Sequence, residues 1–263
     1  MKVLNFSVVF FLCLGVISCS EDDFKPENSE RLITNAETEN RSNEWDITGQ
    51  LHNDFLDFFI TRDDFENSAF RSNLLEITRE FYSINNLPYN GNEINATFDV
   101  FQEMENDGVD VGIVLDNQSS TGCDYIPTLC DLFPFNPFPI PDFNFITSGN
   151  NTDKVLDFIE RTKELENDVL KNDSFSEEQK AVLLESYAVS RYSHQYWHNQ
   201  EVLGNESQWV DSIREIDVIE QACSVCKADF VGAVTGAFTG PGALIGAGAA
   251  SAAQAYANWL FGE

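Results

Sequence analysis

The chain has 263 residues, of which 43% are hydrophobic and 13% aromatic, with 44 Asp and Glu against 15 Lys and Arg. This apolar content is enough to bury a core, which excludes disorder of the whole chain. The formal net charge of −29 repels nucleic acid and anionic lipid surfaces, so we expect no nucleic-acid partner.

The chain begins with a short apolar segment that ends at a cysteine. Lys2 precedes an apolar run over residues 8–17, which is too short to cross a bilayer. Val16-Ile17-Ser18 then leads to Cys19 and resembles the bacterial lipobox, in which a signal peptidase cuts before the cysteine and the thiol carries the lipid. The resemblance implies a signal peptide over residues 1–18, lipidation of Cys19 and attachment to a membrane through that N-terminal lipid.

The residues after the cysteine carry a second resemblance. Cys19-Ser20-Glu21-Asp22-Asp23 is similar to the acidic export signal that sends Bacteroidota lipoproteins to the outer face of the outer membrane. Leu51-His52-Asn53, Ser190-Arg191-Tyr192-Ser193 and the Gly/Ala-rich tail more loosely resemble exported Bacteroidota proteins. The resemblance implies a surface-exposed lipoprotein of the outer membrane and no particular activity. A periplasmic lipoprotein whose tether is acidic by chance is the alternative.

Composition along the mature chain indicates one domain with flanking segments. Residues 19–43 are polar and lack apolar periodicity, which predicts a flexible acidic tether. A helical domain is expected over 44–229, followed by a Gly/Ala-rich segment over 230–263. Removal of residues 1–18, which include Lys2, leaves 245 residues with a formal charge of −30.

Apolar residues recur at three- and four-residue spacing through most of the chain, which predicts a mainly α fold. Ser176 and Gln179 form a capping-box pattern at the start of one helix. Residues 132–141 contain four prolines and are expected to form an extended Phe/Pro-rich loop. Helices are predicted from an N-cap at Asp46 through Phe59, over 70–84, over 152–171, from Ser176 to about residue 199, and from Gln208 through Cys226.

Four cysteines remain after Cys13 leaves with the signal and Cys19 takes the lipid. An even number in an exported chain predicts two disulfides, with three connectivities open. One pair has C-x-x-C spacing within a helical pattern, where a local bond is geometrically awkward, so we favour crosslinks from this helix to the other pair. A four-cysteine zinc site and a redox pair are the alternatives. The four residues are Cys123, Cys130, Cys223 and Cys226.

Two of the three histidines are candidates for a metal site. His194 and His198 are four residues apart on a predicted helix, and Glu201 lies on the same side, so the three could reach one ion. Helical phase places both histidines opposite the apolar stripe of that helix. We therefore expect a solvated or partner-facing polar patch there, with metal binding as the weaker hypothesis.

The tail carries no charge over the 33 residues from Phe230 to Gly262. Helix-interior glycines at four-residue spacing suggest closely approaching backbones. Gly240-Pro241-Gly242 breaks this pattern into two arms, which predicts a helical hairpin. We expect the hairpin to pack on the same domain, with membrane insertion or self-association as alternatives. The glycines of this zipper-like pattern are Gly232, Gly236, Gly240, Gly242 and Gly246.

The leading functional hypothesis is a non-enzymatic interaction protein that binds a protein or a glycan at the cell surface, with no cofactor. The first alternative is a contact-dependent toxin, resembling glycine-zipper bacteriocins, that inserts residues 230–262 into a target membrane. The third hypothesis is a metal-dependent hydrolase that uses His194 and His198.

Overall fold

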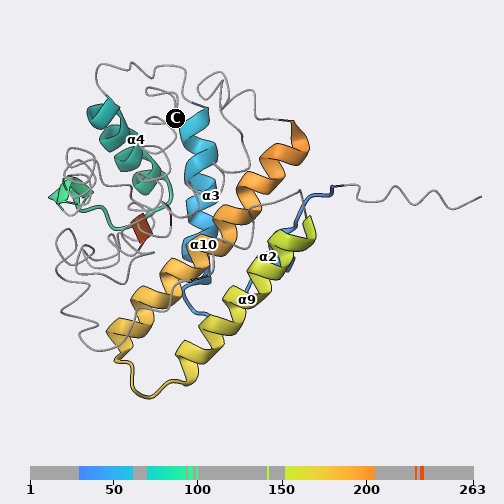
Figure 1. Ribbon diagram of the computed structural model, residues 1–263. Helices are drawn as coiled ribbons and strands as arrows, with labels where there is room; N and C mark the ends of the chain where they lie inside the picture. The colour runs from blue at the N-terminus through green and yellow to red at the C-terminus, as the bar shows by residue number, and fades with distance from the viewer. Residues whose placement is uncertain are drawn as a thin grey trace, which may run out of the picture. The chain divides into compact units, whose positions relative to one another are not determined.

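The computed structural model describes residues 30–61, 70–92, 94–96, 99, 141, 152–204, 229 and 232–233. About 77% of these residues are helical and none of them lies in a strand. The mainly α fold is therefore confirmed for the described part of the chain. Contacts divide the protein into a unit over Met1–Glu30 and a unit over Arg31–Glu263, and the helices of the second unit are drawn in Figure 1.

Helix α10, Glu177–Leu203, is the helix that most other described helices contact. It begins as predicted, because the Ser176 side chain accepts from the backbone N–H of Gln179 and the Gln179 side chain accepts from the Ser176 N–H. It ends at Gly204, whose φ of 62° is left-handed and whose N–H donates to the carbonyls of Gln200 and Glu201. This end lies four residues beyond the predicted one.

Two helices pack along α10. Helix α9, Thr152–Lys171, is joined to α10 by a short turn and runs back beside it, whereas α3, Asp46–Ile60, crosses it (Figure 1). The crossing with α3 is close: a Cβ added at Gly49 would lie 2.5 Å from the carbonyl oxygen of Ala188. Glycine is therefore required at this point of contact.

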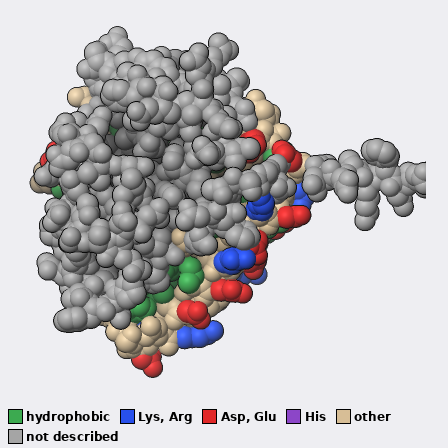
Figure 2. All heavy atoms as spheres, in the orientation of Figure 1, with side chains coloured by type: hydrophobic (Ala, Val, Ile, Leu, Met, Phe, Trp, Pro, Cys, Tyr) green, Lys and Arg blue, Asp and Glu red, His purple; other side chains and the backbone are tan. Residues whose placement is uncertain are grey.

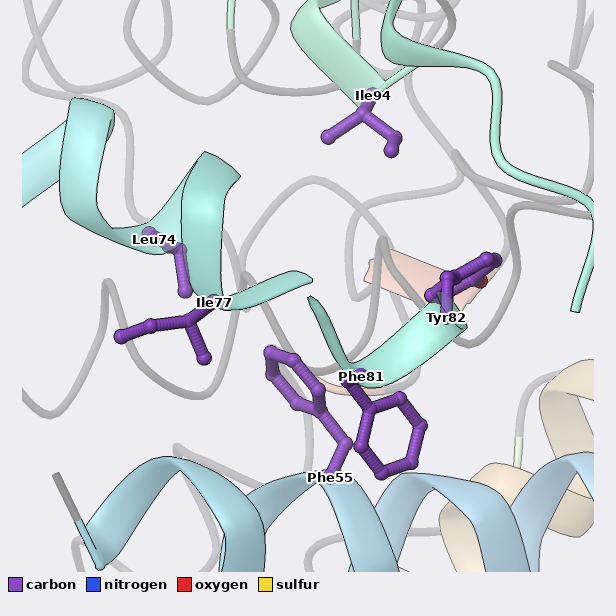
Figure 3. Close-up of a cluster of buried hydrophobic side chains, with 6 residues drawn as sticks. All are labelled: Phe55, Leu74, Ile77, Phe81, Tyr82 and Ile94. Atoms are coloured by element: carbon purple, nitrogen blue, oxygen red, sulfur yellow. The ribbon is translucent and has the colours of Figure 1, made fainter. Parts of the chain in front are cut away.

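Helix α4, Phe70–Ile84, forms an apolar cluster with α3 (Figure 3). The rings of Phe55 and Phe81 meet edge to face with their centroids 5.3 Å apart. The helix ends as predicted: Asn86 adopts a φ of 54° and the Leu87 N–H donates to the Tyr82 carbonyl. The buried members of the cluster are Phe55, Leu74, Ile77, Phe81, Tyr82 and Ile94.

The segment before α3 corrects the predicted tether over 19–43. Residues 31–43 belong to the folded unit and include a short helix, α2, Asn35–Thr38, which contacts α9 and α10. Ile33 is 2% exposed and packs against Val155 and Ile159 of α9. The prediction was wrong because the two adjacent apolar residues Leu32 and Ile33 give no periodicity, although Ile33 is buried.

The start of α3 differs slightly from the prediction. Trp45, rather than Asp46, occupies the N-cap, and Asp46 is the first helical residue. Its carboxylate is therefore available for contacts with other elements instead of capping its own helix.

On the face shown in Figure 2, acidic and basic side chains lie next to one another over α9. Asp157 and Arg161 form an ion pair of 2.7 Å, and Glu160 and Lys163 one of 2.9 Å. The Asp157–Arg161 pair is exposed, and a pair of this kind contributes about 0–1 kcal/mol, so it marks a solvated side of α9 rather than a source of stability.

Several expectations fall outside the described residues. They include the Phe/Pro-rich loop except Pro141, the helix from Gln208 to Cys226, and the tail except for Gly232 and Ala233. No helix in the described ranges is both long and apolar enough to cross a membrane.

Candidate functional site

The middle of α10 is lined with polar side chains that are buried. Helices α2, α3 and α9 contact this helix. His194 and His198 are only 4% and 5% exposed, so the expected solvated patch around them is wrong. The buried polar residues of this helix are Glu185, Ser186, Ser190, Arg191, Ser193, His194, Gln195 and His198.

Arg191 is the centre of the first polar cluster. Its Nε and Nη2 atoms donate to Glu166 Oε1 at 3.1 and 2.8 Å, and Nη2 also donates to Asp46 Oδ1 at 2.5 Å. Nη1 donates to the backbone carbonyl of Thr38. Burial disfavours the guanidinium charge, but the carboxylates of Glu166 and Asp46 outweigh it and raise the pKa of Arg191. One charged side chain thereby joins α2, α3, α9 and α10.

Two asparagines complete the surroundings of Glu166. Asn40 Nδ2 donates to Glu166 Oε2 at 2.5 Å, and Asn43 Nδ2 donates to Oε1 at 2.9 Å and to the Leu184 carbonyl at 2.9 Å. Both carboxylate oxygens of a fully buried glutamate are therefore hydrogen-bonded, which is the condition under which a buried ion pair is tolerated.

His194 lies in a dry environment. Its Nδ1 is 2.7 Å from the Ser190 carbonyl, to which it donates, and its ring stacks on Phe158 with centroids 3.8 Å apart. Burial lowers the pKa of His194 to about 4, so the ring is neutral near pH 7. This histidine is packed as a core residue.

His198 faces the backbone at Arg31 rather than His194. Its Nε2 donates to the Arg31 carbonyl at 3.0 Å and is 3.3 Å from Thr152 Oγ1. Glu201 is half-buried. Within the described residues, no three His, Cys, Asp or Glu side chains are grouped to hold a metal ion, so the structure does not bring His194, His198 and Glu201 together at one.

A second buried cluster surrounds Asp229. Ser193 Oγ donates to Asp229 Oδ2 at 2.6 Å, and His52 Nε2 is 3.5 Å from the same oxygen. The three side chains are fully buried. The serine contacts the carboxylate and not the histidine, so this arrangement differs from a nucleophile–base–acid triad.

Sequence reasoning did not identify Asp229. Its position carries a signal nonetheless, because it is the last charged residue before the 33 uncharged residues of the tail. Gly232 and Ala233, which follow it, are buried as well. The start of the tail is therefore held inside the folded unit.

The remaining predicted site residues lie outside the described ranges. They are the lipidation site Cys19, the disulfide candidates Cys123, Cys130, Cys223 and Cys226, and the tail glycines Gly236, Gly240, Gly242 and Gly246.

Searches with this chain against protein-family models, curated proteins and solved structures give no match.

Proposed function

We propose that the protein is a lipid-anchored protein of the outer cell surface that binds a protein or a glycan and does not transform it. The lipidated end is Cys19, and the folded unit begins at Arg31. The short segment between them tethers the binding unit to the membrane.

One observation carries the non-enzymatic part of this proposal. The side chains of Arg191, Glu166 and His194, which could serve in catalysis if exposed, are buried and bonded to one another or to the backbone. A group that reacts with substrate needs access to it, whereas these groups bond elements of the fold together. Their arrangement supports a rigid scaffold that presents its surface to a partner.

The anchoring is tested by lipid labelling in cells. Cys19→Ser is expected to abolish incorporation of a palmitate analogue, whereas Cys13→Ser, inside the signal, is the matched control and retains it. Equal labelling of both variants would refute lipidation at Cys19.

Surface display is tested with protease added to intact cells. We expect the protein to be degraded, and the variant Glu21→Gln, Asp22→Asn, Asp23→Asn to be lipidated but protected. If the wild type and this variant are equally protected, the protein faces the periplasm.

The binding activity is tested with the purified protein on arrayed glycans and by surface crosslinking in co-culture. Saturable binding without product formation is expected. Release of dye from liposomes that is lost on deleting residues 230–263 would replace this proposal with the toxin, and metal-dependent turnover of a substrate would replace it with the hydrolase.

A further inference from the structure

The residues that begin the folded unit form an extended peptide lying on α9 and α10. Thr34 has φ −86° and ψ 157°, which is extended backbone, and no regular secondary structure is present from Glu30 to Thr34. The segment Arg31–Thr38, named here the N-terminal segment, continues from this peptide into α2.

Side chains of the two helices hydrogen-bond to the backbone of alternate residues of this peptide. Asn199 Oδ1 accepts from the Ile33 N–H at 2.8 Å, and Asn199 Nδ2 donates to the Ile33 carbonyl at 2.8 Å. Gln195 Nε2 donates to that carbonyl at 3.0 Å. Two residues earlier, the Arg31 N–H donates to Thr152 Oγ1 at 3.2 Å, and His198 bonds the Arg31 carbonyl.

The side chains alternate in the same way. Ile33 is buried against Val155 and Ile159, with Leu156 at the edge, whereas Leu32 is 43% exposed. Peptide-binding sites that add a strand to a partner gain affinity from main-chain hydrogen bonds and specificity from pockets for alternate side chains. Here side chains of α9 and α10 supply both the hydrogen bonds to the main chain and the pocket for Ile33.

The N-terminal segment is preorganised by its own bonds. Arg31 and Glu37 form an ion pair of 2.6 Å, and the Thr34 N–H donates to the Glu37 carboxylate at 2.9 Å. Lys163 Nζ bonds the Glu37 carbonyl at 2.5 Å from α9. A ligand that keeps its bound shape loses less entropy on binding.

We propose that this face of α9 and α10 is a peptide-binding groove that takes the N-terminal segment of a second copy of the chain in exchange for its own. The groove recognises the backbone, the Ile33 side chain and the side-chain oxygen of Asn35, all of which a second copy supplies unchanged. The segment stands at the start of the folded unit, which begins at Arg31.

The connection to α3 allows this exchange. The exposed Arg41 and Ser42 lie between Asn40, which is buried against Glu166, and the buried Asn43. A change of backbone direction at Arg41 and Ser42 delivers the segment, with Asn40, to a neighbouring groove. Reciprocal exchange closes a twofold dimer, in which each groove is filled.

The test pairs two full-length variants that carry different affinity tags. Ile33→Asp removes the buried aliphatic side chain of the segment and leaves the groove intact. Asn199→Ala removes the hydrogen bonds that the groove makes to Ile33 and leaves the segment intact. When the two are mixed, the intact segment of one can fill the intact groove of the other. We expect co-purification at least about tenfold above that of Ile33→Asp with itself or Asn199→Ala with itself.

A peptide provides the second arm and covers the case in which a variant folds poorly. A labelled peptide of residues 31–40 is added to full-length Ile33→Ala, whose fold is checked by circular dichroism, and the same peptide with Ile33→Asp is the control. Binding at least about tenfold tighter for the native peptide is expected. Equal affinity for the two peptides, or co-purification no greater than in the self-pairs, would overturn the proposal.

Neither arm depends on lipidation or on an external partner. Failure of the exchange therefore leaves the proposed surface function standing, and failure of the lipid labelling leaves the groove standing.

Discussion

Arg191 on α10 and Glu166 on α9 form an ion pair of 2.8 Å in which both side chains are fully enclosed by protein. Removing one partner of such a pair leaves the other charge buried without compensation, which costs about 3–5 kcal/mol. Exposed pairs lose far less, because water replaces the missing partner.

Arg191→Met is therefore expected to lower the free energy of unfolding by about 3–5 kcal/mol. Arg161→Met is the matched control: Arg161 pairs with Asp157 on the exposed side of α9 at 2.7 Å, and its loss should cost less than about 1 kcal/mol. Urea unfolding measures both. Similar losses in the two variants would contradict the structural role assigned to Arg191.

Gly49→Ala tests the close crossing of α3 and α10. Alanine has the higher helix propensity by about 1 kcal/mol, but its Cβ would meet the Ala188 carbonyl and the Tyr192 ring. We expect a net destabilisation of about 1–3 kcal/mol from overpacking, measured by thermal unfolding. Ile47→Ala, at an exposed position of the same helix, should change stability by about 0.5 kcal/mol or less. A stabilised Gly49→Ala would show that the helices separate easily.

The burial of Glu185 predicts that the free energy of unfolding depends on pH. Burial raises the pKa of Glu185 from 4.5 to about 7. The folded state therefore holds this proton more tightly than the unfolded state, and stability is lost as pH rises from about 4.5 to 7. We expect Glu185→Gln to be up to about 3 kcal/mol more stable than wild type at pH 8 and unchanged at pH 4.

His194 acts in the opposite direction. Burial lowers the pKa of His194 from 6.5 to about 4, so its contribution to stability is present above pH 6.5 and is lost as pH falls toward 4. The effects of Glu185 and His194 offset each other between these values in the wild type. Glu185→Gln should reveal the rise with pH that His194 produces, whereas exposed Glu177→Gln should leave the wild-type curve in place. If the free energy of unfolding changes with pH in the same way for Glu185→Gln and for the wild type, the roles assigned to Glu185 and His194 are excluded.

The cysteines predict two disulfides. Peptide mapping without reduction is expected to join the pair at 123 and 130 to the pair at 223 and 226. Reduction should then lower the free energy of unfolding by about 2–4 kcal/mol. Four free thiols with one bound zinc would instead establish the metal alternative.

Sequence patterns predicted the helices whose boundaries depend on local chemistry. The capping pair Ser176 and Gln179 fixed the start of α10, and apolar spacing gave α4 and α9 with their observed bounds. These signals succeed because the residues that determine them are close together in the sequence.

The polar interior could not be predicted in the same way. Arginine is a residue type that sequence reasoning places on the surface. The burial of Arg191 is favourable only because Glu166 and Asp46 contact it from other helices. The same holds for Asp229, whose partner Ser193 lies on α10. Partners distant in sequence leave no periodic pattern.

The bonds of the N-terminal segment also determine when the chain can fold. They join residues 121 to 167 positions apart, and α3 is bound to α10 through Asp46 and Arg191 across 145 positions. At about 5–20 residues per second of synthesis, the first residues wait roughly 7–30 seconds for their partners to emerge. Contacts this distant in sequence also slow folding after synthesis. The contacts of residues 31–46 with α10 therefore form only after α10 has been made, and this part of the fold closes onto a helix that is synthesised late.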